Sequence, residues 1–241
     1  ISIDMKLSGK KALVTGGGRG LGKAVAIELA NEGVDVVITG RNEENLKQTV
    51  SELTAIGVKA DYVIFSVDSE AEVIAGVNEA AEKIGGIDIL INNAGIGNFG
   101  SIEEMESATW EQVIQTNLFG TYYTSKAALP FLKANGEGDI VNVASTAGLK
   151  GGPNMSAYCA SKAAVISLSQ SMMAEWRKLN IRVITLTPST IASDMSIQGG
   201  LTDGDPDKVL QPEDFAQWVG DMLKMNRRAL IANGSIFSTN P

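Results

Sequence analysis

A short apolar run leads directly into a glycine-rich turn, and the turn leads directly into a helical run. Residues 11–15 read Lys-Ala-Leu-Val-Thr, residues 15–22 read Thr-Gly-Gly-Gly-Arg-Gly-Leu-Gly, and residues 22–30 have a helical pattern. Glycines let backbone N–H groups come close to a phosphate, and the positive end of the following helix points to the same place. This order predicts a dinucleotide-binding turn, although a glycine cluster also forms plain tight turns. The residues expected to contact the ligand are Thr15, Gly16, Gly18, Arg19, Gly20, Leu21 and Gly22.

Apolar, β-rich runs alternate with amphipathic runs along the chain. The expected strands span residues 12–15, 34–39, 62–67, 87–91, 139–143, 182–187 and 229–232. The expected helices span residues 22–31, 43–56, 71–84, 109–133, 157–179 and 212–225. Continuous apolar strands separated by helices indicate a parallel sheet that is covered on both faces. We therefore expect one α/β domain over residues 1–241, a doubly wound Rossmann fold with a seven-stranded, mostly parallel sheet and helices on both faces.

Residues 193–211 differ from the rest of the chain because they are polar and glycine-rich, with little periodicity. They follow an expected strand at the carboxyl edge of the sheet, where ligands bind in this architecture. We expect a lid over the substrate site, and the alternative is a solvated surface loop.

The composition excludes several classes of function. A net charge of −8 argues against nucleic acid or an anionic membrane as the main partner. The absence of histidine excludes Ser-His-Asp and Cys-His catalysis and His-ligated metal sites. The single cysteine excludes an internal disulfide, and no Cys/His cluster offers a zinc site. Any catalysis must therefore use Tyr, Lys, Ser, Asn or carboxylates, and no metal is expected.

The sequence contains no apolar stretch long enough to span a membrane and no leader pattern, so we expect a cytoplasmic protein. Ile1 to Asp4 precede Met5, and we expect them to be residues added ahead of the natural start. Native protein whose intact mass includes Ile1 would contradict that expectation.

The end of the second expected strand indicates which dinucleotide is bound. A fold of this kind that prefers NAD carries an acid there, but residues 38–42 read Ile-Thr-Gly-Arg-Asn. The planar, permanently charged fork of Arg41 suits a 2′-phosphate, and Arg19 adds a second cation. Together they favour NADPH, whereas either arginine alone could be a surface charge. Asp68, after the third strand, is expected to accept from the adenine amino group or, equally well, to cap the next helix.

Tyr158 and Lys162 lie four residues apart at the start of a helical run, which places them on one helix face. A tyrosine titrates near ~10 in isolation, and a nearby ammonium lowers its pKa towards the working range of an acid–base catalyst. Ser145 ends the preceding strand, where its hydroxyl could hydrogen-bond a carbonyl oxygen that gains negative charge. A Tyr-x-x-x-Lys pair alone usually lies on a helix surface without a catalytic role. The catalytic interpretation therefore depends on the order of the motifs along the chain: glycine-rich turn, serine, tyrosine and lysine.

Four motifs occur at the spacing of the short-chain dehydrogenase/reductase family, which the chain resembles along essentially its whole length. They are the glycine-rich turn, Asn92-Asn93-Ala94-Gly95, Asn117 in Thr-Asn-Leu-Phe-Gly, and Ser145 with Tyr158 and Lys162. The resemblance implies that Tyr158 gives a proton to a carbonyl oxygen while NADPH delivers a hydride to the carbonyl carbon. It also implies that Lys162 holds the nicotinamide ribose, that Asn117 holds a proton-relaying water, and that residues 93–95 line the adenine-ribose side.

Two positions depart from the family pattern. Pro188-Ser189 stands where the family has Pro-Gly, and Ser193 stands where it has a threonine beside the nicotinamide carboxamide. The resemblance still implies cofactor contacts for Pro188, Ile191 and Ser193. It further implies a homodimer or homotetramer with residues 109–133 and 157–179 at the dimer contact, although residues 231–241 differ from the family's glycine-rich last strand.

Within the family, the chain is most similar to bacterial 3-oxoacyl-(acyl-carrier-protein) reductases, through its glycine-rich turn, Arg41 and its length. Gly136 and Leu179 occupy the positions of those reductases' key arginines, and Lys133, Arg177 and Lys178 lie nearby as substitutes. The resemblance implies NADPH-dependent reduction of a ketone, either a carrier-bound 3-oxoacyl thioester or a small free ketone or diketone. The alternatives are an NAD-linked alcohol dehydrogenase and a dinucleotide-binding sensor without catalysis.

Overall fold

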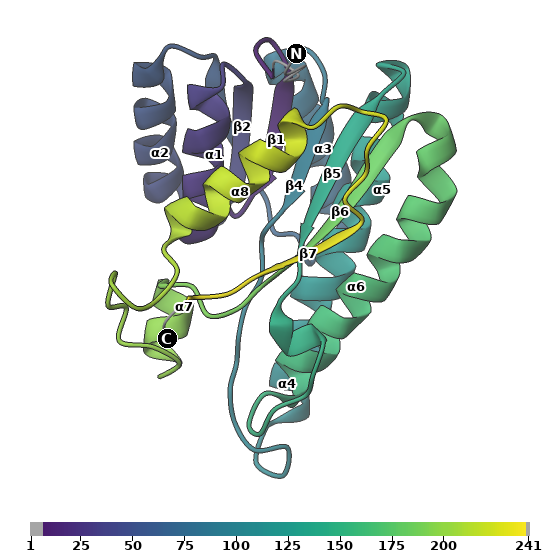
Figure 1. Cartoon of the computed structure of the whole chain (residues 1–241). Coiled ribbons are helices and arrows are strands. Elements are labelled where there is room, and N and C mark those ends of the chain that lie inside the picture. The colour runs from purple at the N-terminus through teal and green to yellow at the C-terminus, as the bar shows by residue number, and fades with distance from the viewer. Residues whose placement is uncertain (1–6, 240–241) are drawn as a thin grey trace.

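A computed structural model of the chain describes residues 7–239, so the expected added residues Ile1 to Asp4 lie outside the described part. Seven strands form one sheet, and every pair of neighbouring strands is parallel. The order across the sheet is β3-β2-β1-β4-β5-β6-β7 (Figure 1). The strands are β1 Lys11–Thr15, β2 Asp35–Gly40, β3 Ala60–Ile64, β4 Ile89–Asn92, β5 Gly138–Val143, β6 Ile181–Pro188 and β7 Asn233–Ile236. The predicted doubly wound, seven-stranded Rossmann fold is confirmed, and the described sheet is entirely parallel.

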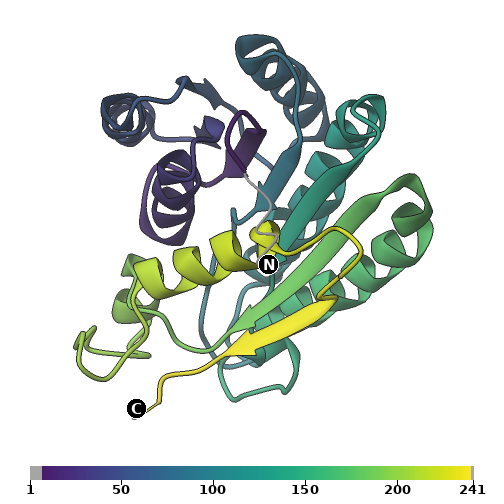
Figure 2. The same ribbon diagram turned by 45° about the horizontal axis from the view of Figure 1, so that its top comes forward.

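Helices cover both faces of the sheet because the strands are apolar on both faces. In β1, Ala12 and Val14 face one core, whereas Leu13 faces the other. Helices α1, α2 and α8 pack on the first core, and α3, α5 and α6 pack on the second (Figure 2). The helices are α1 Gly20–Asn31, α2 Glu43–Ile56, α3 Glu70–Ile84, α4 Ser107–Ile114, α5 Gly120–Ala134, α6 Ser156–Trp176, α7 Asp194–Gln198 and α8 Pro212–Lys224.

The reversal of strand order between β1 and β4 creates the crevice in which ligands bind in this architecture. The chain turns to one side after β1 and to the other after β4, so the two connections separate at the carboxyl ends of these strands. The segments after β1, β4, β5 and β6 therefore meet at one edge of the sheet, at the lower end of the strands in Figure 1.

The single long helix predicted over residues 109–133 is wrong. The structure divides this run into α4, a π-helical turn Gln115–Phe119 and α5. A π turn adds one residue to a helical turn, so it shifts the faces of the helix before and after it. Hydrophobic spacing does not reveal the insertion, because the helical hydrogen bonds continue on both sides. The shift buries Asn117, which is 1% exposed.

The seventh strand was predicted over residues 229–232, but β7 spans Asn233–Ile236. The apolar residues Leu230 and Ile231 pack against the core in the connection from α8, and the ladder with β6 begins only at Asn233. Gly234 permits this placement, because a Cβ there would lie 2.5 Å from the Trp218 ring of α8. Tertiary packing against α8, and not local hydrophobicity, thus selects the strand.

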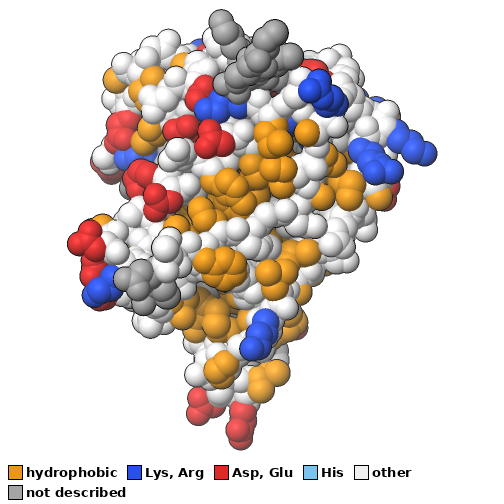
Figure 3. Space-filling view, viewed as in Figure 1, with side chains coloured by type: hydrophobic (Ala, Val, Ile, Leu, Met, Phe, Trp, Pro, Cys, Tyr) orange, Lys and Arg blue, Asp and Glu red, His pale blue; other side chains and the backbone are white. Residues whose placement is uncertain are grey.

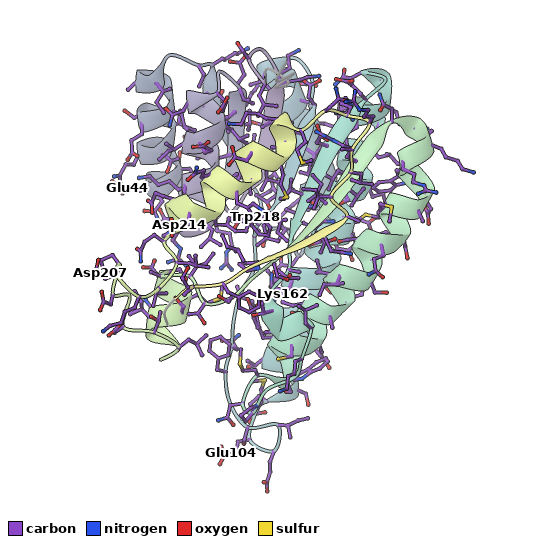
Figure 4. The ribbon with its side chains drawn as sticks, viewed as in Figure 1. Glu44, Glu104, Lys162, Asp207, Asp214 and Trp218 are labelled. Carbon is purple, nitrogen blue, oxygen red and sulfur yellow. The ribbon has the colours of Figure 1, made fainter. Side chains whose placement is uncertain are left out.

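The polar segment 193–211 contains the short helix α7, which the sequence did not predict. Ser193 and Ser196 form a capping box at its start. The ends of the segment are tied together, since Ala192 N–H donates to the Leu210 carbonyl at 2.8 Å and Ile191 bridges to Leu210. Asp207 lies on its outer edge, away from the sheet (Figure 4). The segment is therefore a loop closed at its base, and its action as a lid stays a prediction.

The surface in Figure 3 carries hydrophobic side chains over α8 and β7 and towards the lower end of the strands. The helices expected at a dimer contact also carry exposed aromatic side chains, Phe119 and Tyr122, which are 40% and 39% exposed. That contact stays a prediction. Within residues 7–239, every helix is too short or too polar to cross a bilayer.

Candidate active site

A cavity of about 850 Å³ opens at the carboxyl ends of the strands. It is lined by the turn after β1 and by the segments that follow β2, β3, β4, β5 and β6. Most of the residues predicted from the sequence as site residues line it. They are Gly16, Gly18, Arg19, Gly20, Leu21, Arg41, Asp68, Asn93, Ala94, Gly95, Ser145, Tyr158, Lys162, Pro188, Ile191 and Ser193.

Thr15 and Gly22 were predicted to contact the cofactor, but they do not line the cavity. The buried Thr15 hydroxyl donates to the Ile91 carbonyl and accepts from the N–H groups of Asn93 and Ala94, both at 3.0 Å. Gly22 packs so closely on the turn that a Cβ would lie 2.3 Å from the Gly16 carbonyl oxygen. Both residues hold the turn and the end of β4 together and leave the contact with ligand to their neighbours.

The start of α1 has the features of an anion site. Its N-cap residue, Arg19, makes no side-chain capping hydrogen bond, and the first turn contains no acidic residue. By contrast, Asn42 caps α2 and Ser69 caps α3 through their side chains. The first N–H groups of α1 are therefore available to a ligand, and the helix dipole adds positive potential there. Gly20, with φ of +53° and open space where a Cβ would be, leaves room for a phosphate.

The segment at the end of β2 carries two unused polar groups. Arg41 lines the cavity, is exposed, and forms no ion pair with any residue between 7 and 239. Thr39, which also lines the cavity, has a fully buried hydroxyl without a partner in that same range. A buried hydroxyl that lacks a partner costs free energy, so a ligand that supplies one is favoured. The dinucleotide implied by the family resemblance therefore fits this end of the cavity.

Arg19, the second cation expected at the 2′-phosphate, is engaged differently. Its guanidinium forms an ion pair with Asp194 of α7 at 3.0 Å, and both side chains are more than half exposed. The pair joins the glycine-rich turn to the segment 193–211 across the cavity. A phosphate at Arg19 would therefore compete with Asp194 for this guanidinium.

Asp68 lines the cavity beyond β3, and one of its two interpretations is wrong. The cap of α3 is Ser69, whose hydroxyl accepts from Glu72 N–H, so Asp68 does not cap the helix. Its carboxylate instead accepts a hydrogen bond of 2.8 Å from the Gln112 amide. The strand β3 also ends earlier than predicted, at Ile64, because residues 65–68 turn to form this part of the cavity wall.

The π-helical turn directs the Asn117 side chain towards two segments of the site. Its amide oxygen accepts from Ile96 N–H at 2.8 Å, and its amide nitrogen donates to the Ile96 carbonyl at 2.9 Å and to the Ser161 hydroxyl at 3.0 Å. Ser161 in turn donates to the Tyr158 carbonyl. Asn117 thus ties the segment after β4 to α6 at Ser161, the residue directly before Lys162.

Ser145, Tyr158 and Lys162 converge at the end of β5. Ser145 follows this strand, and its hydroxyl accepts from Ala147 N–H at 3.1 Å, which leaves its proton free to donate. The short turn after Ser145 packs closely on α6, because a Cβ on Gly148 would lie 2.6 Å from the Lys162 carbonyl carbon. This packing sets the distance between Ser145 and α6. Lys162 is buried, lies near the lower ends of the strands in Figure 4, and donates to the Val143 carbonyl at 2.8 Å.

The electrostatics of the pair differ from the prediction. Burial raises the pKa of the Tyr158 phenol, and the hydrogen bond with Ser145 opposes that effect only in part. Burial lowers the pKa of Lys162 to about 8, and its ammonium nitrogen lies 5.6 Å from the centre of the Tyr158 ring. The predicted lowering of the Tyr158 pKa by Lys162 is absent here, because burial is the main cause of both shifts and only the hydrogen bond from Ser145 to Tyr158 opposes it. The phenol stays protonated, as a general acid requires.

Four apolar residues at the far end of the cavity were missed from the sequence. They are Phe99, Met155, Met195 and Leu201. Phe99 lies in the connection from β4 to α4, whose tip at Glu104 points away from the molecule in Figure 4. The sequence feature that could have identified these four residues is that they are apolar side chains within otherwise polar, glycine-rich segments. Their partners come from different segments, so periodicity could not identify them.

The three cations considered for docking an acyl carrier do not flank the cavity. Lys133 lies at the end of α5, and Arg177 and Lys178 follow α6, so all three precede the first residues of β5 or β6. They are exposed at the amino edge of the sheet, opposite the cavity. Figure 3 shows basic side chains gathered at this end of the molecule.

A comparison with protein families finds a match to the short chain dehydrogenase family over residues 10–202. Gluconate 5-dehydrogenase of Gluconobacter oxydans is 34% identical over 213 residues, which cover 88% of this chain and 79% of that protein. The enzyme 2-(S)-hydroxypropyl-CoM dehydrogenase 3 of Xanthobacter autotrophicus is 35% identical over 188 residues, which cover 78% of this chain and 74% of that protein.

A solved structure agrees with this fold. An alcohol dehydrogenase from the archaeon Thermococcus sibiricus, complexed with 5-hydroxy-NADP, superposes with a TM-score of 0.89 at 27% identity. The match covers 96% of this chain and 97% of that one.

Proposed function

The chain belongs to the short-chain dehydrogenase family, and we propose that it is an NADP(H)-dependent oxidoreductase that interconverts a small ketone and a secondary alcohol. The observation that carries this proposal is the convergence of Ser145, Tyr158 and Lys162 on one cavity with the glycine-rich turn. Oxidoreductase chemistry on an alcohol or carbonyl is what the named relatives share.

The residues of the site have separate roles in this proposal. The bound nicotinamide supplies the hydride for reduction and accepts it in oxidation. The Tyr158 hydroxyl gives its proton to the carbonyl oxygen, and the Ser145 hydroxyl donates a hydrogen bond to that oxygen as negative charge develops. The Lys162 ammonium stabilises the phenolate left on Tyr158. Asn117 positions the segment after β4 against α6, and its expected relay water stays a prediction.

The preference for NADP(H) rests on the end of β2. Arg41 is free to bind a 2′-phosphate, no acid stands where a ribose 2′-hydroxyl would be bound, and Thr39 offers an unused hydroxyl. Solved structures that superpose on this chain carry either NADP or NAD, so the preference rests on the residues at the end of β2.

The apolar end of the cavity favours a ketone with apolar substituents over a polyhydroxy acid such as gluconate. Each hydroxyl buried against Phe99, Met155 or Met195 without a partner would cost about 1–3 kcal/mol. A carrier-bound thioester is also disfavoured, because the exposed cations that could bind an acidic carrier lie at the opposite edge of the sheet.

The substrate assay follows NADPH absorbance with butanedione, with acetoacetyl-coenzyme A and with the acetoacetyl thioester on acyl carrier protein. We expect kcat/KM for butanedione to equal or exceed that for both thioesters. A rate far higher on the carrier-bound thioester would instead assign fatty-acid elongation, and the absence of turnover on all three would contradict a carbonyl reductase.

The pH profile of reduction tests the role of Lys162. Its pKa of about 8 lies below the ordinary value of 10.5, so the ammonium is present below about pH 8 and is lost as the pH rises through that value. We expect kcat/KM for carbonyl reduction, which reports on the free enzyme, to fall in this window. A profile that stays flat through pH 8 would show that the charge on Lys162 does not assist the reaction.

A further inference from the structure

Phe99 lies directly beside the proposed acid. Its ring meets the Tyr158 ring edge-on, with the centroids 5.8 Å apart and the planes at 72°. Both side chains line the cavity. A carbonyl oxygen within hydrogen-bond distance of the Tyr158 hydroxyl would therefore place one of its substituents close to Phe99.

The Phe99 ring also contacts the segment 193–211. A Cβ added to Gly199 would lie 2.6 Å from the ring, so the ring packs on the bare backbone at the end of α7. The glycine is not needed for its backbone conformation, because its φ is −76°, which any residue adopts. The missing side chain instead makes room for the ring.

A second contact joins the same two segments. A Cβ on Gly97 would lie 2.8 Å from Phe99 and 3.1 Å from the Met195 sulfur. The connection after β4 and the α7 segment thus contact each other at two glycines, Gly97 against Met195 and Gly199 against Phe99. Phe99, which is partly buried, packs against both Tyr158 and the backbone at Gly199, so a bulky substituent beside Tyr158 would meet its ring.

Resting on the function proposed above, we infer that Phe99 is the specificity-determining residue that limits the size of the substrate substituent next to Tyr158. The substrate class is a compact ketone, in which the group facing Phe99 is no larger than a short alkyl chain. Met155 and Met195, which line the same end, are flexible side chains and adapt to shape more readily than an aromatic ring.

The first test replaces Phe99 by alanine and compares butanedione with its analogue in which one methyl group is a phenyl ring. We expect Phe99→Ala to raise kcat/KM for the phenyl analogue relative to butanedione by about tenfold or more, the scale at which pocket size discriminates. Phe237→Ala, which removes a 61% exposed ring outside the cavity, is the matched control and leaves the ratio unchanged. An unchanged ratio in Phe99→Ala would overturn the inference.

The second test uses Gly199→Ala alone and combined with Phe99→Ala. The added methyl group displaces the Phe99 ring from its present position beside Tyr158, so we expect a changed kcat/KM for butanedione in Gly199→Ala. The methyl group also comes within 2.9 Å of the Met195 carbonyl oxygen. This unfavourable contact is the same whether residue 99 is Phe or Ala, so it cancels when the effects of Gly199→Ala in the two proteins are compared. If Gly199→Ala changes kcat/KM equally with and without Phe99, the ring does not transmit the effect.

A binding measurement separates this inference from the proposed reaction. The shift in melting temperature caused by each diketone, in the presence of NADP, reports binding without turnover. A gain in binding of the phenyl analogue confined to Phe99→Ala supports the size limit even if the wild-type protein reduces neither diketone. Equal shifts for the two diketones in the wild-type protein would refute it even if reduction is observed.

Discussion

Tyr158→Phe is expected to lower the turnover of a ketone substrate by about 10²–10⁴-fold while the affinity for NADPH stays unchanged, because one general acid contributes on this scale. The substitution removes a single oxygen, and that oxygen lies in the cavity beside Ser145. Phenylalanine keeps the ring that packs against Phe99, so the shape of the site is preserved. The measurements are single-turnover NADPH oxidation and a fluorescence titration with NADPH.

The matched control is Tyr122→Phe, which removes the same oxygen from a 39% exposed ring on α5, outside the cavity. Its turnover and melting temperature should match those of the wild-type protein. If Tyr158→Phe retained turnover within a few-fold, the proton would have to come from another group. If the wild-type protein bound NADPH but turned over no carbonyl compound, a dinucleotide sensor would explain the fold better than a reductase.

Arg41→Asp is expected to weaken NADPH binding by about 10–100-fold and to leave NADH binding within a few-fold of the wild-type value. A charged hydrogen bond to a phosphate contributes about 1.5–3 kcal/mol, and the new carboxylate adds repulsion. Arg41 has no ion-pair partner within residues 7–239, so its replacement breaks no contact inside the protein. The readout is the ratio of the two dissociation constants, measured at one salt concentration.

Arg177→Asp makes the same change of charge at an exposed site on the opposite edge of the sheet, and it should leave that ratio unchanged. If both variants lost NADPH affinity equally, the loss would be due to the change in net charge and not to a contact made by Arg41. If Arg41→Asp left NADPH affinity intact, the protein would be better described as an NAD-linked alcohol dehydrogenase, and Arg19 would remain paired with Asp194.

The order of elements and the chemistry of the site follow from local sequence. Strands with apolar residues on both faces, such as β1 and β4, can be stable only between two layers of helices, so their alternation predicts the doubly wound sheet. The glycine-rich turn and the i, i+4 spacing of Tyr158 and Lys162 are likewise local features, and local geometry places them correctly.

Features that depend on contacts between distant segments were decided only by the tertiary structure. Hydrophobic spacing does not register the π-helical turn, because its single extra residue is stabilised by bonds from Asn117 to Ile96 and Ser161. The start of β7 depends on how Trp218 packs over Gly234. The pKa of Tyr158 rises because burial, which no sequence pattern measures, outweighs the hydrogen bond with Ser145.

The substrate end of the cavity shows most clearly the difference between what local sequence determines and what tertiary contacts decide. The sequence by itself determined a dinucleotide fold and predicted the residues that we propose to act on a carbonyl group. Which side chains line this end of the cavity was decided by the meeting of two irregular segments, where Phe99 packs against Tyr158 and Gly199. These segments have neither helical nor strand periodicity, and their contacts arise only when the sheet brings the ends of β4 and β6 to one edge.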